Sequence, residues 1–386
     1  MPELRPSSSQ QRIESLYKID PMAEPWWVHD DELGFLERPL RDERIETLDY
    51  SYVRTTDEHG FANAVGWPDD VAVVFLGDSL LSGVGVGLEG QFTTLVSKQL
   101  SGVPVINLGL PGSSPEHLYG IYQRFGAALE PEIVVACLYV ASDVDNAKHF
   151  DVWNKVGREW PYEDFRANHY VESLARLQAE EKSAPASGTG NPAEGSDSGL
   201  RGWLKSIVNA SVLGREMLYL SEPYRKGRIH GVRWKDGSEV YLYRRFQNRL
   251  EDGIGSDYPG IEQIFFGPLD RLRDAVESNG AAFLVALIPS KEEIFAHPDE
   301  AGNLRLVDEV RASLDEMQMQ TLDLYPAIRQ LARNTAPYYP HDIHLNEAGN
   351  EAVAKAIADW IRNSGVLQKE QRTGQLTSDD MTNDMN

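Results

Sequence analysis

The chain has 386 residues, 41% of them hydrophobic, which is enough for one elaborated domain or two small ones with a sizeable buried core. Acidic residues outnumber basic ones by 60 to 37, giving a formal net charge of −23 at pH 7. Such a surface repels phosphate backbones and anionic lipid, which argues against nucleic acid and acidic membranes as partners.

The N-terminal residues, the apolar runs and the single cysteine indicate the cellular compartment of the protein. Residues 1–20 are polar and lack the apolar stretch of a signal peptide. The longest apolar runs, near residues 71–77, 133–140 and 281–288, are too short to span a bilayer. Cys137 lies in one of these runs, so we expect a buried structural thiol, and no intramolecular disulfide can form. The expectation is a cytoplasmic protein, or an exported one whose leader has been removed.

The pattern of elements changes at residue 71. Residues 1–70 are rich in tryptophan, proline and charge without sustained periodicity, and are predicted to form an N-terminal extension laid over the core. From there, predicted strands alternate with predicted helices, which is typical of parallel strands joined by crossovers in a three-layer α/β/α sandwich. We expect a flavodoxin-like sheet of about five strands in the order 2-1-3-4-5. The strands are predicted at residues 71–76, 103–108, 133–140, 281–288 and 320–324, and the helices at 91–100, 115–129, 269–278, 304–317 and 346–361, with Asn346 capping the last helix.

This alternation breaks between residues 150 and 268, which we interpret as an insertion in a core domain spanning residues 71–365. Residues 179–199 are dense in Ala, Ser, Gly, Pro and Glu without a large apolar residue, and are predicted to be a disordered linker. Residues 200–266 carry many aromatic residues and arginines and are expected to cap or flank the active-site edge. Residues 366–386 are polar and are predicted to form a disordered tail.

Residues 77–80 read Gly-Asp-Ser-Leu directly after a predicted buried strand. This puts Ser79 at the carboxyl end of the sheet, where α/β proteins place ligands, and a following helix would aim its N–H groups at it. A serine hydroxyl is a useful nucleophile only beside a base. Asp342 and His344 precede the last helix, and residues two apart in an extended segment point the same way. Asp342 would orient His344 towards Ser79, which supplies the three roles of a serine triad.

Three segments resemble sequence blocks of the SGNH (GDSL) hydrolases: residues 77–80, Asn-Leu-Gly at 107–109, and the Asp342/His344 pair. They occur in the family's order over about residues 70–365. The family's oxyanion hole uses the serine N–H, a glycine N–H and an asparagine side chain, so the resemblance implies that Ser79 and Gly109 supply the first two. Where the family has Gly-x-Asn-Asp, residues 141–146 read Ala-Ser-Asp-Val-Asp-Asn, which leaves Ser142 or Asn146 as the third donor.

A further segment after the fourth predicted strand, residues 288–295 (Ile-Pro-Ser-Lys-Glu-Glu-Ile-Phe), is similar to a Pro-x-Lys segment in the alginate-type polysaccharide O-acetyltransferase branch of this superfamily. The Asp-x-His spacing fits that branch too. Taken alone, Lys291 is more typical of a solvated or ion-paired loop residue than of a substrate-binding one.

The predicted reaction is acyl transfer from a carboxylic ester, which includes an O-acetyl group on a carbohydrate, to Ser79. His344 acts as general base and then acid, Asp342 orients it, and water releases the acid without a metal or organic cofactor. The alternative is an O-acetyltransferase in which a sugar hydroxyl replaces water. A binding module without catalysis is supported only by residues 141–146, which depart from the family's Gly-x-Asn-Asp. A metal site at His341, Asp342 and His344 is a further alternative, but the sequence shows no second cluster of metal-ligating residues.

Overall fold

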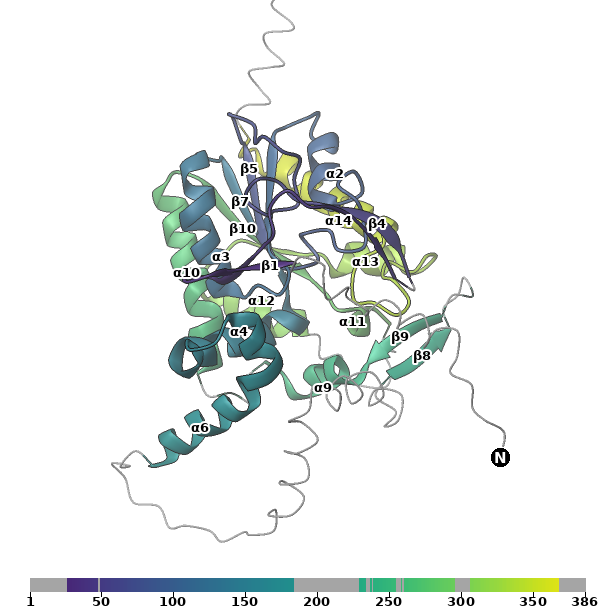
Figure 1. The fold of residues 1–386 in the computed structure, drawn as a ribbon. Coiled ribbons are helices and arrows are strands. Elements are labelled where there is room, and N and C mark those ends of the chain that lie inside the picture. Colours follow the sequence, from purple (N-terminus) through teal and green to yellow (C-terminus); the bar gives the residue numbers. More distant parts are fainter. Residues whose placement is uncertain are drawn as a thin grey trace, which may run out of the picture.

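A five-stranded parallel sheet lies at the centre of the molecule (Figure 1). The computed structural model describes residues 26–47, 49–183, 229–233, 237, 239–254, 258, 260–295 and 306–367. The central strands are β5 (Val73–Gly77), β6 (Val105–Gly109), β7 (Ile133–Tyr139), β10 (Ala282–Ile288) and β11 (Thr321–Asp323).

The order of these strands across the sheet is β11-β10-β7-β5-β6, and each neighbouring pair is parallel. Numbered along the chain, this is the predicted order 2-1-3-4-5, so the α/β fold with a five-stranded parallel sheet is confirmed. Every residue of β5 and β7 is buried. Because these strands are covered on both faces, their sequences are continuous apolar runs without alternation.

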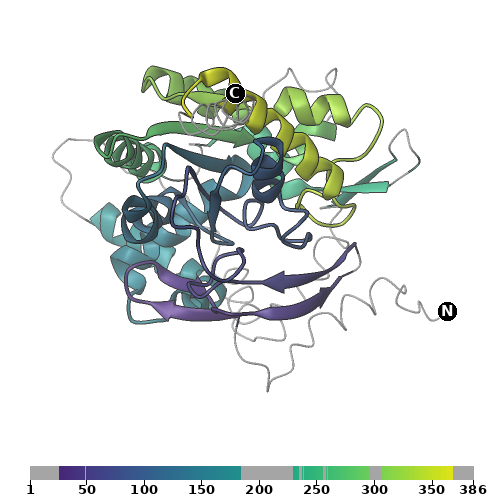
Figure 2. The same ribbon diagram turned by 90° about the horizontal axis from the view of Figure 1, so that it is seen from above.

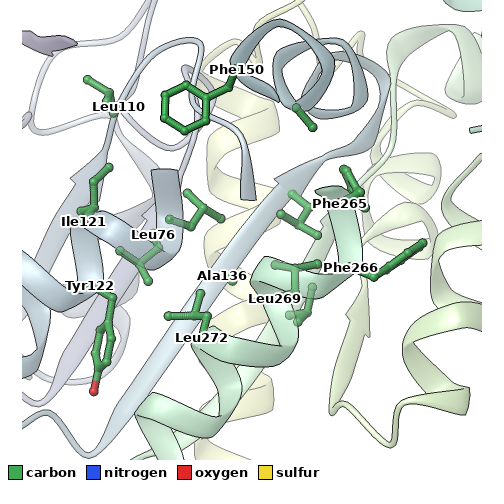
Figure 3. Close-up of a cluster of buried hydrophobic side chains, with 14 of the residues drawn as sticks. Leu76, Leu110, Ile121, Tyr122, Ala136, Phe150, Phe265, Phe266, Leu269 and Leu272 are labelled. Carbon is green, nitrogen blue, oxygen red and sulfur yellow. The ribbon is translucent and has the colours of Figure 1, made fainter. Parts of the chain in front are cut away.

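Helices cover both faces of the sheet. Alternate residues of a strand enter opposite layers: Val74 and Leu76 of β5 belong to one core cluster, and Phe75 belongs to the other. Figure 3 shows the first cluster, in which Leu269 and Leu272 face Ala136 of β7. The first layer contains α3 (Pro115–Ile121), α4 (Val140–Val152), α10 (Ile261–Ser278) and α12 (Leu306–Glu316); the second contains α2 (Phe92–Gln99), α13 (Tyr325–Leu331) and α14 (Glu347–Ser364).

The described part of the N-terminal region forms two antiparallel hairpins that the sequence did not predict. They pair β1 (Trp27–Asp30) with β2 (Gly34–Glu37), and β3 (Asp42–Glu46) with β4 (Ser51–Thr55). Figure 2 shows these strands, in purple, along one side of the core. Strand β2 is fully buried, so this region contributes to the core as well as covering it. Strands of four or five residues are too short to give a clear alternation in the sequence.

The insertion contains regular elements between the core strands. They are α5 (Tyr162–Asp164), α6 (Tyr170–Ser183), β8 (Ile229–Arg233), β9 (Glu239–Tyr243) and α9 (Arg244–Asp252), with π-helical turns at Trp153–Gly157 and Phe165–His169. The linker predicted at residues 179–199 starts too early, because α6 continues through Ser183. The residues there, Ala-Glu-Glu-Lys-Ser, include good helix formers, which favour continuation. Residues 184–199 lie outside the described residues, as do residues 368–386 of the predicted tail.

Most other boundaries agree with the predicted elements. The crossover at residues 115–129 consists of α3, a π-helical turn (Tyr122–Gly126) and a 3-10 turn (Ala127–Leu129). The side chain of Asn346 accepts the Gly349 N–H at 3.0 Å and caps α14 as predicted. Helix α10 was predicted to start near Leu269, but it starts at Ile261 and contains Pro268, which would ordinarily end a helix. None of the helices in the described residues is long and apolar enough to cross a membrane.

Candidate active site

Ser79 lies in a tight turn at the carboxyl edge of the central sheet. It follows β5 by two residues, and the turn is closed by a 3.0 Å hydrogen bond from the Ser82 N–H to the Asp78 carbonyl. A Cβ on Gly77 would come within 2.8 Å of the Cys137 carbonyl, so the strand must end there in glycine. The sequence analysis expected the following helix to aim its N–H groups at the serine. The next helix, α2, starts only at Phe92, so Ser79 gains no helix N-terminus from it.

The structure brings Ser79, His344 and Asp342 into one chain of hydrogen bonds. His344 Nε2 lies 2.8 Å from Ser79 Oγ, and His344 Nδ1 lies 2.6 Å from Asp342 Oδ1. Asp342 and His344 lie in the segment between α13 (Tyr325–Leu331) and α14, and the contact with Ser79 places this segment at the carboxyl edge of the sheet. With Asp342 on Nδ1, the imidazole presents its other nitrogen to the serine hydroxyl, which is the geometry required of a general base.

The loop that carries Asp342 is bent rather than extended. Asp342 Oδ1 accepts the backbone N–H of Ile343 at 2.6 Å and that of His344 at 3.3 Å, besides the imidazole. The predicted contact between Asp342 and His344 is present, but its reason is different. The Asp342 carboxylate accepts hydrogen bonds from the backbone that follows it, which forms an Asx turn, and this turn brings the His344 ring to the carboxylate. The alternation of side chains along an extended strand is not the cause.

Burial and neighbouring charges shift the pKa values of Asp342 and His344 in opposite directions. Burial of the His344 ring favours its neutral form, but the adjacent Asp342 carboxylate and, to a lesser extent, Asp78 outweigh this and raise the pKa of His344. Lys291 acts in the opposite direction on the same ring. Burial of Asp342 favours the neutral acid, but His344 and the hydroxyl of Tyr50 lower the pKa of Asp342 below its usual value. Asp342 is therefore a carboxylate at neutral pH.

Three of the four predicted oxyanion donors, all but the Ser79 N–H, donate hydrogen bonds within the chain. The Gly109 N–H donates to Asn107 Oδ1 at 2.8 Å, because the Asn107 side chain folds back over the end of β6. Ser142 Oγ donates to Asp78 Oδ2 at 3.2 Å, and Asn146 Nδ2 donates to the Ser113 carbonyl at 2.9 Å. Gly109 and Ser142 are thus directed at side chains of the protein, contrary to their predicted role. Asn146 keeps one amide hydrogen free of this bond.

Two carboxyl groups are buried beside Ser79. Asp78 accepts the Leu80 N–H at 2.9 Å and the Ser142 hydroxyl, while Asp143, on the first turn of α4, has one oxygen without a partner in the structure. Burial raises the pKa of both groups, and their mutual repulsion adds to the shift at Asp143. Of the two, Asp143 lies in the segment that stands where the family has Gly-x-Asn-Asp, and Ser142 of the same segment binds Asp78. Their contacts hold the serine turn against α4.

Two residues outside the predicted site contact residues 339–346, the segment with Asp342 and His344 that we call the acid–base loop. Tyr50 Oη donates to Asp342 Oδ2 at 2.7 Å. Asp49 accepts the backbone N–H of His341 at 2.6 Å and lies 2.7 Å from His341 Nδ1. Both residues belong to the turn between β3 and β4, almost 300 positions before the loop, and no motif in the sequence marks them.

Lys291 was predicted to be a solvated or ion-paired loop residue, and this is wrong. Its side chain is buried at the start of α11 (Lys291–Phe295), where Nζ donates to the carbonyls of Asp342 at 2.7 Å and Pro340 at 3.2 Å. Burial lowers the pKa of Lys291 to about 8. The ammonium thus ties the backbone of the acid–base loop to the end of β10.

Strand β9 of the insertion flanks the same loop, as expected for part of residues 200–266. The Tyr241 N–H donates to the Pro340 carbonyl at 2.8 Å, and the Tyr241 ring stacks on His341 with centroids 4.4 Å apart. The acid–base loop is therefore held by three elements from distant parts of the chain. Among the residues that the structure describes, no group of three or more His, Cys, Asp or Glu side chains is arranged to hold a metal ion.

Residues 267–384 match the family model described as the SGNH hydrolase-like domain of the acetyltransferase AlgX. This part of the chain is therefore SGNH hydrolase-like, as the motifs predicted. The match includes Lys291, Asp342 and His344, and it excludes Ser79, which comes from the N-terminal half of the sheet. No curated protein matches the chain.

Three solved structures that resemble this chain share 10–11% sequence identity with it. A lipolytic protein of the G-D-S-L family from Veillonella parvula is 10% identical, with 75% of this chain and 97% of that chain covered and a TM-score of 0.36. A GDSL-like lipase from Bacteroides thetaiotaomicron is 10% identical (78% and 93% covered, TM-score 0.36). A catalytic mutant of an acetylxylan esterase from Geobacillus stearothermophilus is 11% identical (76% and 94% covered, TM-score 0.36). Because these TM-scores are below 0.5, the fold assignment rests on the sheet itself.

Proposed function

We propose that the protein is an O-acyltransferase, with acetyl as the group transferred, which works through an acyl-enzyme on Ser79. The observation that carries this proposal is the 2.8 Å contact between Ser79 Oγ and His344 Nε2, with Asp342 on the opposite nitrogen of the ring. A serine so placed has a base within reach of its proton, and the base is itself oriented.

In the first half-reaction, Ser79 Oγ attacks the carbonyl carbon of the donor ester while His344 Nε2 takes the hydroxyl proton. The bond to the leaving alcohol then breaks, and His344 returns the proton to that oxygen. In the second half-reaction, His344 removes a proton from the acceptor hydroxyl, whose oxygen attacks the acyl carbon. The bond between the acyl carbon and Ser79 Oγ then breaks, and His344 returns the proton to Ser79 Oγ. Asp342 holds the ring and balances the charge of the imidazolium in both steps.

The acceptor separates two candidate functions. Ester hydrolysis, the first prediction from the motifs, uses water, whereas a transferase uses the hydroxyl of a second substrate. The match of residues 267–384 to an acetyltransferase family supports the transferase better than the esterase. We further propose a carbohydrate hydroxyl as acceptor, because the segment at residues 288–295 and the Asp-x-His spacing resemble the polysaccharide O-acetyltransferase branch.

A partition experiment tests this function. The protein is given p-nitrophenyl acetate with and without a panel of soluble oligosaccharides, and p-nitrophenol, free acetate and acetylated sugar are measured together. We expect acetylated sugar to accumulate and free acetate to fall by the same amount for at least one sugar. Release of acetate alone with every sugar would support the esterase instead. The Ser79→Ala variant is the control for reaction without the enzyme.

A further inference from the structure

The β3–β4 hairpin contacts both loops that carry the candidate triad. We infer that this hairpin is a working part of the active site and that Tyr50 is a positioning residue for Asp342. The inference rests on the proposed function, since it assigns Tyr50 a role in the reaction of Ser79 and His344. The N-terminal region, which the sequence predicted to be an extension over the core, then also contributes to the active site.

The two oxygens of Asp342 have separate partners. Oδ1 faces the His344 ring at 2.6 Å, while Oδ2 accepts the Tyr50 hydroxyl at 2.7 Å. A carboxylate that is hydrogen-bonded at both oxygens cannot rotate about the Cβ–Cγ bond without losing a hydrogen bond. Tyr50 therefore keeps Oδ1 directed at the imidazole, and it withdraws part of the negative charge that Asp342 presents to the ring.

Tyr50 is itself held in place by its neighbours. The turn is closed by the Thr47 N–H, which donates to the Tyr50 carbonyl at 2.8 Å. The residue before Tyr50, Asp49, binds both the backbone N–H and the ring of His341. The Tyr50 ring also packs against Tyr339, with centroids 4.7 Å apart. Two adjacent residues of the hairpin thus dock on two adjacent residues of the acid–base loop, which fixes the register between them.

The same hairpin reaches the serine turn through Arg54 on β4. The Arg54 guanidinium is buried and donates to the carbonyl of Ser82, whose own N–H closes the turn around Ser79. Its charge is balanced by Glu37 of β2, which also binds Arg41. One short hairpin therefore spans from the nucleophile loop to the acid–base loop. The hydrogen bond of Arg54 is buried and those of Asp49 and Tyr50 are partly buried, and each of them involves a charged group. Removing one partner of such a bond is costly, because the other partner is left without it.

The hydroxyl of Tyr50 remains a donor over the whole working range of pH. Burial and the Asp342 carboxylate raise the pKa of Tyr50 well above its usual value, so the phenol stays protonated. Its hydrogen bond is also one of the contributions that lower the pKa of Asp342. Without it, the carboxylate would carry more charge towards His344. Because a stronger anion favours imidazolium, the pKa of His344 should then rise further.

The test replaces Tyr50 by Phe, with Tyr52→Phe as the matched control. Tyr52 lies two residues further along the hairpin, its ring is 5.7 Å from that of Tyr50, and it loses the same hydroxyl group without touching Asp342. For wild type and both variants, we would measure kcat and KM for p-nitrophenyl acetate from about pH 5 to about pH 9. The rate of labelling by a fluorophosphonate probe would be measured alongside.

We expect Tyr50→Phe to lower kcat by about tenfold with little change in KM, since a hydrogen bond to a charged group is lost. Its acid limb should lie at higher pH than that of the wild type, while Tyr52→Phe should keep the wild-type limb. A Tyr50→Phe profile with an unmoved limb would overturn the inference, even if kcat fell, because mere support of the loop would not shift a pKa. Failure of the wild type to react with the probe would instead refute the proposed function.

Discussion

His344 Nε2 lies 2.8 Å from Ser79 Oγ, although the two residues are separated by 265 positions in the chain. The contact forms at the carboxyl edge of the sheet, where β5 ends and where the segment between α13 and α14 lies beside Ser79. The contact makes His344, and not the neighbouring His341, the candidate base for Ser79.

The first prediction compares the two histidines of the acid–base loop. His344→Ala should remove nearly all ester turnover, since it deletes the base. His341→Ala should retain a large part of it, because the His341 ring is bound to Asp49 and stacked on Tyr241 rather than bound to Ser79. The measurement is kcat/KM on one ester for both folded variants. A dead His341 variant beside an active His344 variant would show that the roles are reversed.

The second prediction concerns the carboxylate. Asp342→Asn should lower kcat by about 10²–10⁴, because the amide can neither balance the imidazolium charge nor hold the same tautomer. Asp359→Asn makes the same chemical change on the outer surface of α14, where Asp359 pairs with Lys355, and should leave kcat unaltered. Steady-state kinetics with thermal melting would separate loss of catalysis from loss of folding. Equal activity of the two variants would remove Asp342 from the mechanism.

The third prediction is the pH dependence of the wild type. The base must be neutral, and the Asp342 carboxylate raises the pKa of His344 above the ordinary value of about 6.5. A raised pKa means that the ring gains its proton already at higher pH as the solution is acidified. The acid limb of kcat/KM should therefore lie above 6.5. A profile that is flat from about pH 5 to about pH 9 would exclude a titrating histidine.

The fourth prediction concerns the buried lysine. Lys291→Met should lower kcat by about tenfold, because the Asp342 and Pro340 carbonyls lose their donor and the loop that carries the base is less well fixed. The melting temperature should change less than these lost bonds alone suggest, since burying the ammonium is itself unfavourable. Lys355→Met on the exposed face of α14 is the control. Unchanged kcat in folded Lys291→Met would show that the loop holds its geometry without the lysine.

The central sheet and its helices could be predicted from the sequence because each of these elements is recognisable from its own residues. The buried strands are continuous apolar runs, the helices show their own spacing, and Asn346 is recognisable as a cap. The short hairpins β1–β4 gave no such signal, since four or five residues cannot establish a period. Helix α6 also continued into a segment whose composition, rich in Ala and Glu, is compatible with both a helix and a linker.

The candidate site was only partly predictable for a related reason. Ser79, Asp342 and His344 lie in recognisable motifs, but the residues that hold them do not. Tyr50 and Lys291 reach the acid–base loop through the tertiary fold, and their residue types have many ordinary roles on a protein surface. The role of the Gly109 N–H as an oxyanion donor was inferred from a family pattern. In the structure this N–H donates to the Asn107 side chain, a local hydrogen bond that the pattern does not predict.

The central claim is that Ser79 forms a covalent acyl-enzyme with the help of His344. The most direct measurement is mass spectrometry of the intact protein, and of its peptides, after brief reaction with p-nitrophenyl acetate and an acid quench. We predict one acetyl group per chain on the peptide that contains Ser79, none in folded Ser79→Ala, and slow formation in His344→Ala. Turnover of the ester by folded Ser79→Ala at the wild-type rate, or an acetyl group found only at another residue, would contradict the claim.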